Sequence, residues 1–119
     1  MEIKDATQAL AALGQATRLS VYRLLVEAGP QGRMAGEIAE ALSLPGATLS
    51  FHLKELSAAG LIRGEQLGRF IRYSADFQRM TELIGFLTRN CCGGEPSMCA
   101  PPTTGSLRDA ARVRTRRTD

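Results

Sequence analysis

Three cysteines lie close together near the C-terminal end of this 119-residue chain. Cys91 and Cys92 are adjacent, and Cys99 follows across two glycines and a proline. Because glycine and proline suit tight turns, a short loop could bring the three sulfurs to one point. Three thiolates without a neighbouring histidine form a soft, three-coordinate ligand set, whereas structural zinc usually takes four protein ligands.

This ligand set favours a trivalent metalloid. As(III) makes three bonds to sulfur and keeps a lone pair, so it fits a pyramidal site of three thiolates. Sb(III) fits for the same reason, and methylated As(III) needs only two sulfurs. A thiol-bearing tail and a redox switch that forms a disulfide remain open as alternatives. We expect no enzyme, because the cysteines lack a base or a partner at Cys-x-x-Cys spacing.

A second group of residues could contact nucleic acid. The spacing predicts a helix from about 45 to 59, with Leu49, Leu53 and Leu56 along one side and Gly60 ending it. Small hydroxyls and a lysine on the other sides suit base edges and phosphates in a major groove. The candidate DNA contacts on this helix are Thr48, Ser50, Phe51 and Lys54.

The segments on either side of this helix decide between a DNA-binding and a purely structural interpretation. A short helix over 34–42 and a break at 43–46 precede it, which gives a helix-turn-helix pattern. Strands over 62–66 and 70–74 follow, joined by a turn with Arg69 at its tip and Arg72 close by. Helix, turn, helix and basic hairpin is the order of a winged helix, which favours DNA binding.

Three further helices are predicted over 3–13, 17–28 and 76–88, and Asp76 is expected to cap the last of them. The apolar stripe of the last one exceeds what a three-helix core needs, so we expect it to form a dimer face together with the first helix. The expected fold is mainly α: a winged helix-turn-helix with about five helices and a two-stranded β-hairpin, forming a homodimer through the first and last helices. We expect a DNA-binding and dimerisation domain over 1–90, a cysteine loop over 91–99 and a flexible basic tail over 100–119.

Composition agrees with a soluble DNA-binding protein. The chain has 44% hydrophobic residues and a formal net charge of +3, and five arginines fall within its last twelve residues. Positive charge favours double-stranded DNA as a partner. We expect a cytoplasmic protein without a membrane partner, because no apolar run could cross a bilayer and the N-terminus lacks a signal-peptide pattern.

The order of elements and several motifs resemble the ArsR/SmtB family of dimeric winged-helix metalloregulators. The resemblance covers roughly residues 10–99 and is most specific in the segments Leu13–Leu19, Leu49–Leu56, Ala59–Ile62 and Gly68–Tyr73. It implies a repressor that occupies an operator and leaves it when a metal or metalloid binds. It also implies that the helix over 45–59 is the recognition helix, which makes His52 a helix or phosphate-contact residue and adds it to the candidate DNA contacts.

Both usual inducer sites of that family are absent here. The segment 33–38 lacks the cysteine pair of the best-known arsenic sensors, and Gln78 stands where the zinc sensors have their first histidine, although Asp76 is present. Some arsenic-responsive members are similar in placing their cysteines at the C-terminal position. We therefore expect a repressor that needs no cofactor and that As(III), Sb(III) or methylated As(III) releases through Cys91, Cys92 and Cys99. A repressor of the same fold that senses oxidation or a soft divalent metal is the alternative.

Overall fold

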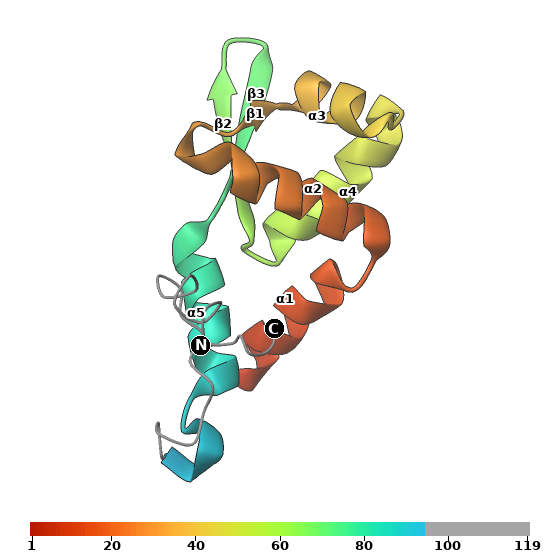
Figure 1. The fold of residues 1–119 in the computed structure, drawn as a ribbon. Coiled ribbons are helices and arrows are strands. Elements are labelled where there is room, and N and C mark those ends of the chain that lie inside the picture. Colours follow the sequence, from red (N-terminus) through yellow and green to blue (C-terminus); the bar gives the residue numbers. More distant parts are fainter. Residues whose placement is uncertain (95–119) are drawn as a thin grey trace, which may run out of the picture. The chain divides into compact units, whose positions relative to one another are not determined.

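Five α-helices and a small antiparallel sheet make up residues 1–94, the part of the chain that the computed structural model describes (Figure 1). The chain divides into two units, Met1–Leu87 and Thr88–Asp119. Cys99 and the predicted tail over 100–119 lie outside the described residues. None of the helices within residues 1–94 is long and apolar enough to cross a membrane. The elements follow the order α1 (Ile3–Leu13), α2 (Ala16–Ala28), η1 (Gly29–Gln31), β1 (Arg33–Met34), α3 (Ala35–Leu42), α4 (Gly46–Ala58), β2 (Ile62–Leu67), β3 (Phe70–Ala75), α5 (Phe77–Thr88) and η2 (Cys91–Gly94).

Side chains satisfy backbone N–H groups at the start of several helices. The Gln15 side chain accepts a hydrogen bond from the Arg18 N–H at 2.8 Å, and Glu37 accepts one from the Met34 N–H at 2.8 Å. Asp76 accepts from the Arg79 N–H at 3.0 Å, which confirms the predicted cap of α5. The first N–H groups of a helix have no partner within it, so these bonds fix where α2, α3 and α5 begin.

The sheet has one strand more than the sequence predicted. β3 is central in the order β1-β3-β2, and the β2–β3 hairpin is confirmed. β1 contributes the third strand by pairing Arg33 with Tyr73 and Met34 with Arg72. The helix predicted over 34–42 begins one residue later, because the backbone of Met34 is extended and Met34 is the N-cap of α3. A two-residue strand carries no periodicity, so only the pairing with distant β3 defines it.

The chain passes very close to β3 at Gly32. This residue is buried at a φ of +66°, and a Cβ built on it would lie 2.1 Å from the Tyr73 carbonyl oxygen. Both the backbone conformation and the contact exclude any side chain here. Gly32 therefore allows β1 to reach its place beside β3.

The core draws on α1 to α4 and the sheet, and the fully buried residues of α1 are all small. The residues that α1 buries are Ala6, Ala9 and Ala12, whereas Ile3 is 70% exposed and Leu10 is also exposed. Alanine leaves room for the backbone of α1 to lie close to its neighbours. Within α5 only Leu83 is buried.

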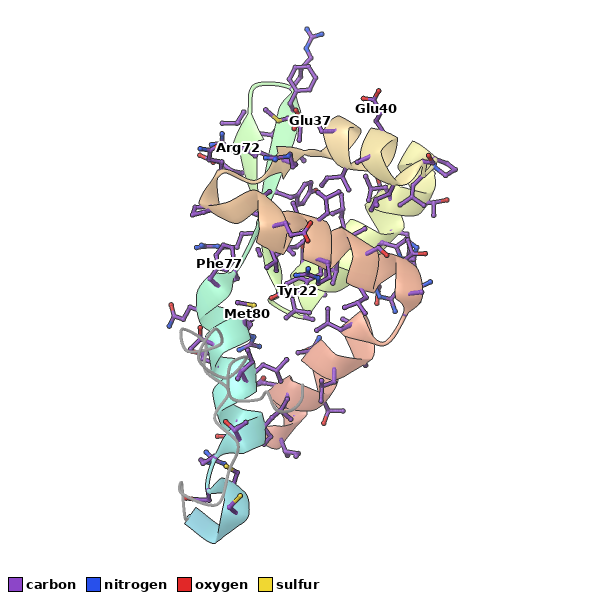
Figure 2. All side chains as sticks on the ribbon, in the orientation of Figure 1. Tyr22, Glu37, Glu40, Arg72, Phe77 and Met80 are labelled. Atoms are coloured by element: carbon purple, nitrogen blue, oxygen red, sulfur yellow. The ribbon has the colours of Figure 1, made fainter. Side chains whose placement is uncertain are left out.

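Tyr22 places a polar hydroxyl group in the core. Tyr22 is buried, and its hydroxyl has no hydrogen-bond partner among the described residues. Burial, and secondarily the charge of Asp76, raises the pKa of Tyr22 above its ordinary value. The phenol therefore stays neutral, since a buried phenolate would lack the solvation of water. Figure 2 labels Tyr22 beside α2.

A comparison of Gly32 with Gly29 can measure the free energy associated with the close contact between Gly32 and Tyr73. Gly29 has nearly the same backbone, with φ +76° and ψ −165° against φ +66° and ψ −162° at Gly32, but a Cβ at Gly29 would meet no atom within 4 Å. We expect Gly32→Ala to lower the free energy of unfolding by about 1–3 kcal/mol more than Gly29→Ala. Urea denaturation followed by circular dichroism measures both. Equal losses would show that the contact with Tyr73 is not tight.

Candidate nucleic-acid interface

Helix α4 has one face in the core and one face in solvent. Its inner face carries Leu49, Leu53 and Leu56, all buried. These positions are four and three residues apart, the spacing that keeps side chains on one side of a helix. The outer face carries the predicted contacts, all of them exposed: Thr48, Ser50, Phe51 and Lys54. This face offers hydroxyls, an aromatic ring and one cation.

His52 lies on the inner side of α4 and is not among the exposed side chains of this helix. Its exposed fraction is 8%, and it is the buried polar residue of the described core. Its ring Nδ1 lies 3.4 Å from Nη1 of Arg18. A guanidinium can only donate, so Nδ1 must be the acceptor and carry no proton in this contact. Position 52 follows Leu49 by three residues and therefore falls on the leucine face.

Arg18 connects three helices, and the sequence analysis did not single it out. Its Nε donates to the carbonyl oxygen of Ala12 at 2.8 Å, and its backbone N–H donates to Gln15. One side chain thus joins the last turn of α1, the first turn of α2 and the middle of α4. The signal was present in the sequence, because a lone histidine on a leucine face needs a buried polar partner.

The wing presents its basic tip to solvent. The turn contains Gly68 at φ +66°, and the Gln66 side-chain amide donates to the Gly68 carbonyl oxygen at 2.7 Å. Arg69 is exposed at this tip, as predicted. Arg72 lies back on the sheet, where its Nη2 is 3.1 Å from Oε1 of Glu65 (Figure 2). Arg69 is therefore the better placed of the two for a phosphate, since Arg72 already has a carboxylate partner.

The described cysteines follow α5 directly. Cys91 and Cys92 are exposed within η2, where Cys92 and Gly93 have φ of +57° and +67°. A hollow of about 240 Å³ is lined by Thr88, Asn90, Cys91 and Gly94. Residues 1–94 contain no group of three or more His, Cys, Asp or Glu side chains placed to hold a metal ion. A three-thiolate site therefore requires Cys99, so that prediction is not tested by these residues.

Comparison with known proteins supports a regulator of transcription. Residues 13–65 match the family model of a helix-turn-helix domain. An ArsR-like transcriptional regulator from Rhodococcus sp. RHA1 has a similar structure, with a TM-score of 0.66, 25% sequence identity and coverage of 94% of this chain and 92% of that chain. Because the similarity is to transcription regulators, the expectation that this chain is not an enzyme is confirmed.

Two more distant structures share the fold. HlyU from Vibrio cholerae N16961 has a TM-score of 0.59 at 24% identity, over 77% of this chain and 99% of that chain. The homodimeric winged helix-turn-helix DNA-binding domain of Mb0332 from Mycobacterium bovis has a TM-score of 0.59 at 22% identity, over 78% of this chain and 86% of that chain. A search of curated proteins gave no match. The predicted winged helix-turn-helix fold is confirmed.

A double-mutant cycle tests the contact between Arg18 and His52. Because the partly buried guanidinium of Arg18 loses one of its two acceptors when the imidazole is removed, we expect Arg18→Met and His52→Leu to be coupled by about 0.5–1.5 kcal/mol in unfolding free energy. His52→Gln, which retains an acceptor, should lose less than His52→Leu. Urea denaturation of the four proteins gives the coupling. Strictly additive losses would mean that the two side chains do not interact.

Proposed function

We propose that this chain, a winged helix-turn-helix transcription regulator similar to ArsR-like proteins, is a homodimeric repressor. As(III) or Sb(III) would release this repressor from its operator. The observation that carries the DNA-binding part is the outer face of α4 within the matched helix-turn-helix domain. The buried inner face holds the backbone of this helix in place, so its exposed side chains project from fixed positions. A fixed helix favours recognition because its backbone does not have to be ordered when DNA binds.

The proposed DNA contacts come from α4 and the wing. Thr48, Ser50 and Phe51 would meet base edges and thymine methyl groups, and Lys54 would meet a phosphate. Arg69 would bind the backbone or the adjacent minor groove. A dimer would present two α4 helices to successive major grooves, about 34–36 Å apart along the duplex.

The aliphatic surface of α1 and α5 supports the dimer. Ile3 and Leu10 of α1 and Ile84 and Leu87 of α5 are all exposed. Large aliphatic side chains on the two terminal helices of Met1–Leu87 suit an isologous interface with a second copy. The homodimeric state given for the Mb0332 domain, which shares the fold, agrees with this assignment.

The proposed inducer site consists of Cys91, Cys92 and Cys99. Cys91 and Cys92 are exposed and adjacent, and Cys91 lies three residues after the end of α5. They would supply two of the three sulfurs for As(III), or both sulfurs for methylated As(III). Each new metalloid–sulfur bond would replace a metalloid–hydroxide bond, the thiol proton leaving with that hydroxide as water, and the bonds together would order the loop. Because the loop continues α5, ordering it would change the dimer face and turn the two α4 helices out of register. A coupling of about 1–3 kcal/mol is typical of such linkage.

The two lysines of the chain give a matched test of DNA binding. Lys54 lies on the outer face of α4 and Lys4 on α1, and both are exposed. We expect Lys54→Ala to weaken binding about tenfold for each subunit and to reduce the salt slope of the dimer by about 2, because each subunit loses one phosphate contact. Lys4→Ala, with the same change in net charge, should leave both unchanged. Fluorescence anisotropy with a duplex from upstream of the protein's own gene measures them, and equal effects would reject α4 as the DNA-binding element.

Release of that duplex tests the inducer. With a phosphine reductant present, we expect stoichiometric As(III) or Sb(III) to release the DNA and Zn(II) to leave it bound, because three thiolates suit the metalloids. Cys91→Ser and Cys99→Ser should bind DNA normally and resist release. If As(III) releases DNA from the Cys99→Ser protein as it does from the wild type, the three-thiolate site is rejected and a two-thiolate site is retained.

The same assay distinguishes the competing sensors. DNA binding that no ion affects but that oxidation abolishes would assign the cysteines to redox sensing, since the thiols would then act by forming a disulfide. Release by Cd(II) or Zn(II) alone would assign them to a soft divalent metal.

A further inference from the structure

The large exposed hydrophobic side chains of residues 1–94 differ in chemistry from one region to another. Those on α1, α2 and α5 are all aliphatic. The exposed aromatic ones are Phe51, 56% exposed on α4, and Phe70, 60% exposed on the wing. Phe77 and Phe86 are partly buried against the core. The phenylalanines left in solvent thus lie on the elements assigned to DNA, and the function proposed above accounts only for Phe51.

Phe70 cannot reach the core of its own subunit. It is the first residue of β3 and pairs with Leu67 across the hairpin. Successive side chains of a strand point to opposite faces, and the next residue, Ile71, is the one that is partly buried. Phe70 therefore stays in solvent whatever side-chain rotamer it adopts, beside the exposed cation of Arg69.

The wing ends in a short turn that presents single side chains to a partner. Only Gly68 and Arg69 connect Leu67 to Phe70, so the tip is narrow, and the Gln66 bond to the Gly68 carbonyl oxygen stiffens it. A B-DNA minor groove is about 6 Å wide and attracts arginine where it narrows. Proteins that bind there often insert an apolar side chain between two base pairs and bend the duplex.

We propose that Phe70 is a wedge that enters the minor groove beside Arg69, unstacks one base step under each wing and bends the operator. This inference rests on the proposed DNA binding and assigns the wing a role in specificity. Flexible pyrimidine–purine steps unstack most easily, so the operator should prefer TA or CA steps at a position where no base edge is contacted. Arg69 supplies the attraction to the groove, and Phe70 supplies the apolar surface that replaces base stacking.

Two optical signals on the upstream duplex test the wedge. 2-Aminopurine placed in turn at each adenine reports unstacking as a rise in fluorescence, and end-to-end energy transfer reports the bend. The wild-type protein should raise the fluorescence at one step on each side of the α4 contacts and shorten the end-to-end distance. Phe70→Ala should abolish both signals and weaken binding about tenfold for each wing, because stacking on an aromatic ring is lost.

A matched aromatic variant separates the wedge from general loss of affinity. Phe51→Ala removes an equally exposed ring from α4 and should weaken binding while leaving the unstacking and the bend intact. Phe70→Leu, which remains apolar, should retain part of both signals. Since Phe70 is exposed, its replacement should leave the unfolding midpoint unchanged, whereas Phe51→Ala also removes an edge contact with the His52 ring, whose centroid lies 5.5 Å away.

The outcomes distinguish this inference from the function on which it rests. Absence of any DNA binding by the wild-type protein would overturn the proposed function and the wedge together. Tight wild-type binding without unstacking or bending, or a Phe70→Ala protein that bends DNA like the wild type, would overturn the wedge alone. Loss of affinity on Phe70→Ala without a wild-type bend would make Phe70 a simple contact.

Discussion

Burial of one face of α4 is the constraint on which the rest of the structure depends. Leu49, Leu53 and Leu56 are placed against α1, α2, α3 and β2, so most of the fold touches this one helix. Each buried leucine contributes about 1.5–3 kcal/mol relative to an exposed one. The same packing that stabilises the domain therefore fixes the direction of the exposed face. Stability and presentation of the DNA-facing side chains are one property of this helix.

Polar contacts tie α1 to α4 in addition to the apolar packing. The Arg18 side chain bridges the Ala12 carbonyl and His52, and the Gln8 amide donates to the Ala58 carbonyl oxygen at 3.2 Å. α1 is thus connected to the middle and to the end of α4. Hydrogen bonds are directional, so a shift of α1 would be felt by α4 rather than absorbed by side-chain repacking. If α1 forms the proposed dimer face, this connection gives it a short physical route to the exposed face of α4.

The sequence was sufficient for whatever depended on local spacing. The limits of α1, α2, α4 and the hairpin, the cap at Asp76 and the exposure of Thr48, Ser50 and Lys54 all agree with it. What it did not give depended on distant partners. β1 exists only through β3, His52 is turned inward by packing and by Arg18, and three alanines rather than leucines anchor α1. The cysteine chemistry could be inferred from residue type, but its geometry depends on a loop that spacing alone does not shape.

The small anchor of α1 has a consequence for the single subunit. Ala6, Ala9 and Ala12 bury little area and Leu13 is only partly buried, so α1 gains less from its own core than α2 or α4 does. Two larger side chains, Ile3 and Leu10, are exposed and contribute only when something covers them. In a lone subunit α1 should open often, with backbone amides that exchange with solvent well before those of α4. Its order would then vary with protein concentration, because a second copy would supply the missing contact area.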